Sequence, residues 1–428
     1  MAAPEQYDPH YLRDVTALGD THDIHTSQAI FSRNRIKLVE KGVRLDSHLY
    51  ERLMQHKLLP PIEECLTVEG AVTGGELKAK AAALLDSDAG YALLKDAKAR
   101  PAELLLALEG APLDSPLAVR LTVMRERRQE MFRHSLSVAL LTVYLGRRAG
   151  RVSGELAQWA GAGLYHDLGE MHIDSELLGA KRSLTAGERR QMRAHPLTAY
   201  LILQMRASCS EELADAVFEH HERLDGSGYP RGIRGDELGD AGRALAIAEL
   251  AATFFSPPRG AGALSRLPVV LQLNHRRFDR AFTNHIIVLA RQAKPSDAAG
   301  GATPDAAIER LRAIQAVFRD WQAFAPAGAA TAGGENAAYY WVAERMGQLE
   351  RSLLEAGLDM SQDPELAASL AEDAAGRAEL PAAARELTWL LVEIVQGLYA
   401  RLGESRNVPL AAWAEKVDAA LGQGRADA

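Results

Sequence analysis

Histidines and carboxylates gather in the middle of this 428-residue chain. Six of its thirteen histidines fall between His134 and His221. His134 lies four residues after Glu130, so both occupy one face of a helix, in line with apolar residues such as Val138. Burying such groups costs free energy unless each finds a partner. A metal ion is one possible partner, and an ordinary hydrogen-bonded core contact is the other.

Further candidates of the same two types follow along the chain. His166 and Asp167 stand side by side, and His195 comes next. His220 and His221 are adjacent, and two buried histidines would repel each other if both were charged. A metal removes this repulsion because it binds both as neutral imidazoles.

Taken together, these residues predict a metal centre. Imidazole and carboxylate without thiolate suit Fe, Mn, Zn or Ni better than Ca or Mg, and we expect Fe or Mn. Eight ligands are more than one ion needs, so a carboxylate, naturally Asp167, would bridge two ions roughly 3.5–4 Å apart. Such a pair activates a water and holds phosphoryl oxygens, which predicts phosphoester hydrolysis with His166 and Asp167 as the catalytic core. The candidate ligands are Glu130, His134, His166, Asp167, His195, His220, His221 and Glu249.

The elements that would position these ligands are helices. Ser115-Pro116 is a helix start, and helical patterning runs from there to about residue 148, before Gly150. Further helices are expected over 153–165, after the capping box of Thr185 and Glu188, and over 240–254. We therefore predict a mostly α protein.

Composition shifts divide the chain into three expected domains. Residues 1–110 read as a small N-terminal module with no chemical motif, and residues 115–295 hold all the candidate ligands. A linker rich in Ala, Gly and Pro follows at 293–303. Residues 305–428 read as a C-terminal helical extension whose Leu and Ala stripes form a core.

Charge and cysteine content exclude several classes. The net charge is −8 and the pI is near 5.9, which argues against binding a nucleic acid polymer. Only two cysteines occur, far apart, which argues against a disulfide scaffold or a cysteine-based zinc site and fits a reducing compartment. The most apolar run, 387–400, is interrupted by Glu393 and Gln396 and is too short to span a membrane. We expect a cytoplasmic protein.

The order of these motifs resembles the HD-GYP domain, a bacterial subset of the HD metal-dependent phosphohydrolases. The most specific stretch is HHERLDGSGYPRG, residues 220–232, which follows His134, His166-Asp167 and His195. The resemblance covers about residues 115–295. It implies a helical bundle with two or three divalent ions and hydrolysis of the bacterial second messenger cyclic di-GMP. It also implies that the loop around Tyr229 shapes the substrate pocket or docks a signalling protein.

Three positions depart from the family pattern. Glu170 stands where the family has a lysine that contacts a substrate phosphate; a negative charge about 5 Å from phosphate would cost roughly 3 kcal/mol at an effective dielectric of about 20. Glu249 stands where the family usually has aspartate, which keeps the carboxylate. Only Arg259 remains of an arginine-rich segment. Arg223, Tyr229 and Arg259 are the candidate substrate contacts.

Three functions follow from this pattern. The first is a metal-dependent phosphodiesterase acting on cyclic di-GMP. The second is a catalytically weak module that senses a ligand or binds a protein, which Glu170 favours. The third is an HD phosphohydrolase for another nucleotide.

Overall fold

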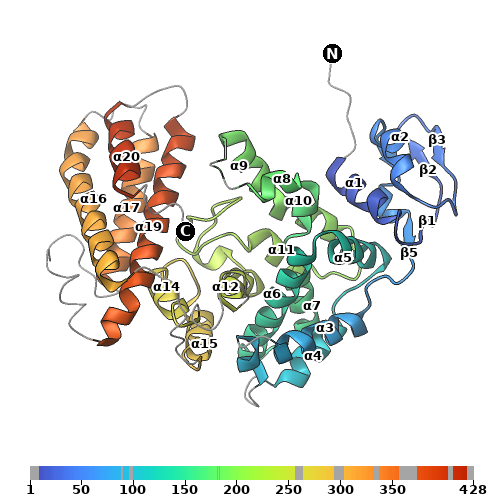
Figure 1. The fold of residues 1–428 in the computed structure, drawn as a ribbon, viewed down its shortest axis with the longest axis horizontal. Helices are drawn as coiled ribbons and strands as arrows, with labels where there is room; N and C mark the ends of the chain where they lie inside the picture. Colours follow the sequence, from blue (N-terminus) through green and yellow to red (C-terminus); the bar gives the residue numbers. More distant parts are fainter. Residues whose placement is uncertain are drawn as a thin grey trace. The chain divides into compact units, whose positions relative to one another are not determined.

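Helices dominate the computed structural model of this chain, as the sequence predicts (Figure 1). The structure describes residues 9–87, 90–95, 100–180, 182, 184–255, 264–293, 303–330, 337–355, 374–402 and 408–421. Two compact units are present, one comprising residues 1–260 and 284–292 and the other comprising residues 261–283 and 293–428. Residues 1–110 therefore share a unit with the central segment. The three domain boundaries expected from the sequence stay a prediction.

The N-terminal part of the first unit mixes short helices with very short strands. Strands β1 and β5 pair antiparallel, with Ile24 opposite Val68, and a second sheet has the order β3-β2-β4. Strands of two or three residues leave little periodicity in a sequence, which is why none was predicted. The elements are α1 Pro9–Leu18, β1 Ile24–Thr26, β2 Ile30–Ser32, β3 Lys37–Val39, η1 Ser47–Leu49, α2 Tyr50–Met54, β4 Leu58–Leu59, η2 Ile62–Glu64, β5 Leu66–Val68, α3 Gly74–Ser87, η3 Tyr91–Lys95 and α4 Pro101–Glu109.

The central helices of this unit surround the candidate ligands. The capping box of Thr185 and Glu188 is present at the start of α9. The single helix predicted over 115–148 is wrong, because the chain breaks at Arg128, where φ is −137° and ψ is 60°. The elements are α5 Ser115–Arg127, α6 Gln129–Arg148, α7 Ser153–Tyr165, η4 Leu168–His172, α8 Ser175–Leu178, α9 Ala186–Met192, α10 His195–Gln204, α11 Glu211–Glu219, η5 Gly235–Glu237 and α12 Asp240–Phe255.

The second unit is a helical bundle with its own apolar core. Its helices are α14 Leu267–Leu273, α16 Pro304–Ala330, α17 Ala337–Glu355, α19 Ala374–Leu402 and α20 Val408–Leu421, and α15 Arg280–Ala290 begins in this unit. The core includes Ile314, Phe318, Met346 and Leu391, which are fully buried. None of the helices in the described part of the chain is long and apolar enough to cross a lipid bilayer.

Close contact between α6 and α7 brings two of the ligand-bearing segments together. A Cβ placed on Gly163 of α7 would overlap the backbone of Ala139 on α6. The absence of a side chain at residue 163 therefore sets the separation of the two helices. His134 lies in α6, and His166 follows the last turn of α7.

We expect Gly163→Ala to destabilise the protein by about 1–3 kcal/mol, because the added methyl group forces two packed backbones apart. Gly154→Ala, in the same helix, is the control, since a Cβ there meets nothing within 4 Å. That change should be neutral or stabilise by up to about 1 kcal/mol. Urea unfolding followed by circular dichroism measures both, and equal effects of the two substitutions would contradict this account.

Candidate metal centre

Seven of the eight predicted ligands converge in the structure. Their ligand atoms form two groups, each with all atoms within 4.8 Å of one another, and Asp167 belongs to both. Cluster 1 contains His134, His166, Asp167 and Glu249, and cluster 2 contains Asp167, His195, His220 and His221. Imidazole and carboxylate atoms grouped in this way could hold divalent metal ions, with Asp167 common to both groups. Glu130, the eighth residue, is exposed and belongs to neither cluster.

Three histidines sit at helix ends and are oriented in the same way. The carbonyl oxygen three residues earlier accepts a hydrogen bond from Nδ1 of His166 (2.8 Å, from Gly163), His195 (2.7 Å, from Met192) and His220 (2.6 Å, from Val217). A carbonyl can only accept, so Nδ1 carries the proton. In the neutral ring Nε2 then holds a lone pair, which is the form that binds metals.

The Nε2 atoms of His195 and His220 face each other, and in the neutral rings neither carries a proton that could form a hydrogen bond between them. Nε2 of His195 and Nε2 of His220 lie 3.2 Å apart. Nε2 of His166 is buried and lies 3.0 Å from an oxygen of Asp167 and of Glu249, yet it makes no well-directed hydrogen bond. Lone pairs that face each other in a dry site repel, and a cation between them removes the repulsion. The residues present therefore fit a bound metal ion.

Asp167 reaches the histidines of both clusters, whereas Glu249 reaches those of cluster 1. Oxygens of Asp167 lie 3.0 Å from His166 Nε2 and 3.4 Å from His195 Nε2. Glu249, at the position where a shorter aspartate was expected, brings one oxygen within 2.9 Å of His134 Nε2 and 3.0 Å of His166 Nε2. The extra methylene of glutamate does not take the carboxylate out of the site.

Glycine allows His195 to approach Asp167. A Cβ on Gly169, two residues after Asp167, would overlap the backbone of His195. The first turn of α10 therefore packs directly on η4. Residue 169 is therefore a glycine for a steric reason. Any side chain there would push His195 away from the shared carboxylate.

Burial sets the charge state of cluster 2. Burial is the main cause that lowers the pKa of His195 and His221 and lowers that of His220 to about 3. The neighbouring imidazoles lower the pKa of His220 and His221 further. These three rings are therefore neutral at pH 7. In cluster 1, burial opposes a proton on His166, but the charges of Asp167 and Glu249 outweigh it and raise the pKa of His166.

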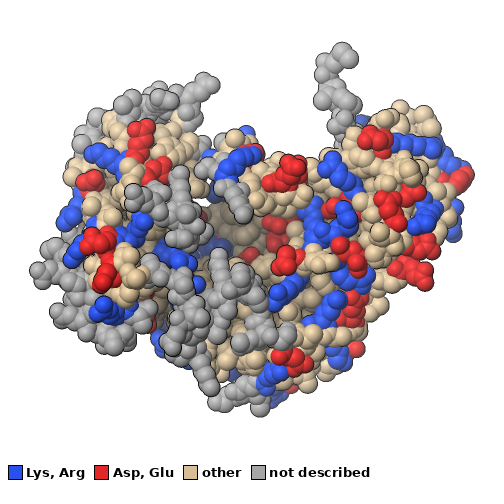
Figure 2. Space-filling model, viewed as in Figure 1, with Lys and Arg blue, Asp and Glu red and all other residues tan. Residues whose placement is uncertain are grey.

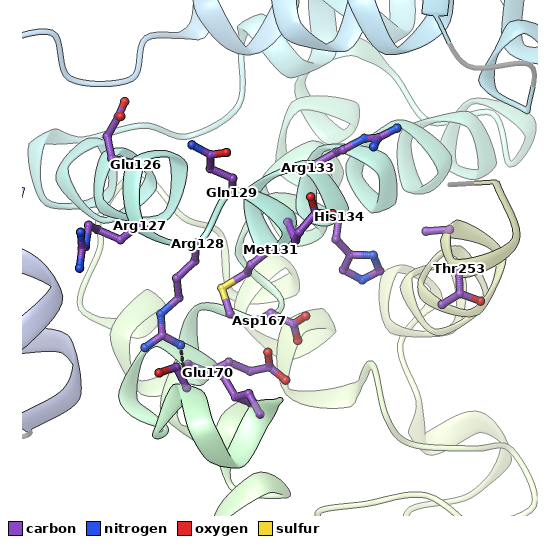
Figure 3. Close-up of a pocket in the computed structure, with 14 residues that line it drawn as sticks. Glu126, Arg127, Arg128, Gln129, Met131, Arg133, His134, Asp167, Glu170 and Thr253 are labelled. Carbon is purple, nitrogen blue, oxygen red and sulfur yellow. Dashed lines mark hydrogen bonds between the residues drawn. The ribbon is translucent and has the colours of Figure 1, made fainter. Parts of the chain in front are cut away.

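A pocket of about 840 Å³ opens beside cluster 1. Figure 3 shows His134, Asp167 and Glu170 around it, with Glu170 extending toward the same space as Asp167. Burial and the charge of Asp167 raise the pKa of Glu170 to about 8, so this carboxyl group is mostly neutral at pH 7. The repulsion of phosphate that the sequence predicts at Glu170 is accordingly reduced.

The predicted substrate contacts have other partners. Arg223 donates to the carbonyl oxygens of His220 and Glu222. Tyr229 stacks on His221, with ring centroids 4.6 Å apart, and so braces a candidate ligand. Arg259 lies outside the described residues.

The sequence analysis missed three arginines that line the pocket, Arg127, Arg128 and Arg133. The basic run RERR just before Gln129 is a signal that could have found two of them. Elsewhere, Figure 2 shows basic and acidic side chains interspersed over the visible face rather than gathered by sign.

The segment that carries both clusters is similar to known proteins. Residues 119–279 match the family model described as the HD domain. Relatives include 3'3'-cGAMP-specific phosphodiesterase 1 of Vibrio cholerae serotype O1, 33% identical over 35% of this chain and 35% of its own, and cyclic di-GMP phosphodiesterase PA4108 of Pseudomonas aeruginosa, 32% identical over 28% of this chain and 29% of its own. The matches span about a third of the length of these relatives.

A solved structure, that of Bd1817, an HDG"Y"P protein from Bdellovibrio bacteriovorus, aligns with 65% of this chain and 98% of its own at 14% identity. The TM-score is 0.35, a likeness too low to support an argument about the fold.

The low pKa of His220 predicts an acid-sensitive metal-free protein. In the unfolded chain this ring binds a proton below about pH 6.5, whereas in the folded chain it does so only near pH 3. The unfolded state therefore binds more protons between these values, and stability falls as the pH falls. From pH 7 to 5 the contribution of His220 is a loss of about 2 kcal/mol.

Chelator-treated wild type and His220→Asn, compared by urea unfolding at each pH, test this prediction. The variant should lose clearly less stability than wild type between pH 7 and 5. Parallel pH profiles of the two proteins would show that His220 is not held neutral.

Proposed function

We propose that this chain, whose residues 119–279 form an HD domain, is a metal-dependent phosphodiesterase that hydrolyses cyclic di-GMP. The observation that carries the proposal is the pair of clusters that share Asp167. The names of the relatives, which act on cyclic di-GMP or on 3'3'-cGAMP, support a cyclic dinucleotide as the substrate class.

Each cluster would hold one divalent ion, with Fe or Mn preferred and Zn or Ni as alternatives. Ions held there would supply a water of lowered pKa and stabilise charge on phosphoryl oxygens. The chain's own residues supply the rest. The i−3 carbonyl bonds keep Nε2 of His166, His195 and His220 turned toward Asp167. Burial of these rings keeps water away from the ligand atoms.

The pocket beside cluster 1 supports a nucleotide substrate. Its volume of about 840 Å³ lies within the range of small-molecule sites. Arg127 and Arg133 line it, and guanidinium groups suit phosphate oxygens. The side chains of Met131 and Leu178 also line it and offer an apolar surface to a base.

Glu170 favours a second candidate, a module that binds the ligand but turns it over slowly. Its carboxyl group lines the pocket with Asp167, where the resembling family has a lysine for phosphate. A neutral carboxyl group donates a single hydrogen bond and offers no positive charge to phosphate.

Metal content should follow the two clusters. We expect wild type to retain two ions per chain after anaerobic loading with Mn²⁺ or Fe²⁺, and His134→Ala and His221→Ala each to retain about one. Asp167→Asn should weaken both sites, because it removes the shared charge. Inductively coupled plasma mass spectrometry after gel filtration measures the ratio. An unchanged metal content in Asp167→Asn would contradict a shared ligand.

Hydrolysis of cyclic di-GMP by Mn²⁺-loaded protein tests the activity itself, with 3'3'-cGAMP assayed in parallel. We expect His166→Ala and Asp167→Asn to lower kcat/KM by at least about 100-fold. His48→Ala, an exposed histidine of the N-terminal part, is the matched control and should equal wild type. Retained turnover in His166→Ala would rule out this centre as the site of reaction.

Substitution of Glu170 separates the two candidates. Glu170→Gln removes any negative charge on this side chain without adding a positive one, so it should change kcat/KM less than Glu170→Lys does. Glu170→Lys should lower KM, because it adds an attraction to phosphate. Wild type that binds cyclic di-GMP without hydrolysing it, together with turnover by Glu170→Lys, would favour the binding module instead.

A further inference from the structure

Arg128 occupies the break between two helices next to the metal centre. Its backbone leaves the helical conformation between α5 and α6, and only 10% of its side chain is exposed. Figure 3 shows this side chain crossing the rim of the pocket toward Glu170. A guanidinium carries five N–H donors, and when it is largely buried most of them need acceptors in the protein. The acceptors of Arg128 therefore identify the segments that this side chain connects.

The guanidinium holds the end of η4. Nη1 donates to the carbonyl oxygen of Glu170 at 2.9 Å, and Nη2 lies 3.4 Å from the carbonyl oxygens of Met171 and Ile173. The carbonyl of Glu170 also accepts from the backbone N–H of Ile173 at 3.0 Å, so the guanidinium adds a second donor at the point where η4 ends. Asp167 is the N-cap residue immediately before η4, so Arg128 binds the opposite end of the short helix that follows the shared carboxylate.

The same side chain also binds the N-terminal part of the unit. Nε donates to an oxygen of Asp14 in α1 at 2.8 Å, and the Asp14 side chain is only 17% exposed. Arg128 thus joins α1 to η4 through one guanidinium. Removing one partner of such an enclosed pair leaves the other charge without compensation.

A second set of contacts joins the same two segments. Tyr11 of α1 stacks on His172, the last residue of η4, with ring centroids 5.4 Å apart. Arg120 of α5 lies 4.8 Å from the centroid of the Tyr11 ring and 3.3 Å from Nε2 of His172. Arg120 is itself buried and donates to Glu63 of η2 at 2.7 Å. Two members of this set, Tyr11 and Glu63, belong to the part of the chain before residue 110.

We propose that Arg128 is a positioning residue for Asp167, and that docking of the N-terminal part through Asp14 regulates the metal centre. The inference rests on the proposed function only in taking Asp167 as the shared metal ligand. When α1 shifts, the guanidinium moves with Asp14, and its hydrogen bonds to the carbonyls at the end of η4 are lost. The orientation of Asp167 then changes, and both clusters lose a ligand at the same time. In this way the region before residue 110, which carries no chemical motif, would control the orientation of Asp167 through its contact with Arg128.

Four variants test the proposal. Asp14→Asn removes the negative charge that pairs with Arg128. Arg128→Lys keeps the positive charge but removes the several N–H donors of the guanidinium, since one ammonium group cannot reach several carbonyls at once. Asp14→Glu keeps the pair and is the conservative rescue. Glu40→Gln is the matched control, because it breaks the exposed pair with Lys37 in the same N-terminal part, away from η4.

Mn²⁺ affinity, measured by electron paramagnetic resonance of the free ion, is the main readout, and kcat and KM for cyclic di-GMP are the second. We expect Asp14→Asn and Arg128→Lys to weaken Mn²⁺ binding by at least tenfold and to lower kcat more than they raise KM. Asp14→Glu and Glu40→Gln should match wild type. Circular dichroism confirms that each protein is folded.

Unchanged Mn²⁺ affinity in folded Arg128→Lys overturns the proposal, even where stability falls, because a merely structural arginine would lower the Tm and leave the metal site intact. Equal losses in Asp14→Asn and Glu40→Gln overturn it too. The Mn²⁺ titration needs no substrate. If wild type fails to hydrolyse cyclic dinucleotides while the affinities shift as expected, the proposed function fails and this inference stands.

Discussion

One shared carboxylate, Asp167, is the constraint on which the central unit depends. Five imidazoles group around it in the two clusters, three of them buried, and the Nε2 atoms of His195 and His220 lie only 3.2 Å apart. In a dry interior such an arrangement is costly unless a cation occupies the centre. The surrounding helices bury an apolar core and also hold these ligand atoms close enough together to bind a cation.

At three helix ends the same local hydrogen bond orients a histidine toward Asp167. His166, His195 and His220 each follow a turn whose carbonyl oxygen fixes the proton on Nδ1, so the same backbone geometry occurs three times in different sequence contexts. Close approaches at Gly163 and Gly169 then bring these ends together. Because both approaches are between backbones, neither neighbour can move aside, and the spacing of the ligands is set by main-chain contact.

Electrostatics explains how the centre tolerates its acidic neighbour. Glu170 lies beside Asp167 with its carboxyl group largely buried, and in the metal-free protein a second negative charge there is disfavoured. The carboxyl group consequently keeps its proton near neutral pH. The arginines of the pocket rim come instead from the end of α5 and the start of α6. Positive charge at the pocket thus comes from these arginines and not from residue 170.

The sequence by itself determined the helical class and most of the residues that converge in the two clusters, because residue type and order carry that information: an adjacent His-Asp pair, an adjacent His-His pair and caps such as Thr185 are local. It misjudged what depends on distant parts of the chain. Glu130 shares a helix face with His134, but the face turns to solvent one turn earlier. The helix over 115–148 breaks at Arg128 because that side chain is drawn to Asp14, 114 residues away, and to the carbonyls of η4. Only the tertiary structure decided these points, since periodicity reports the face a helix buries and not the atoms that meet it.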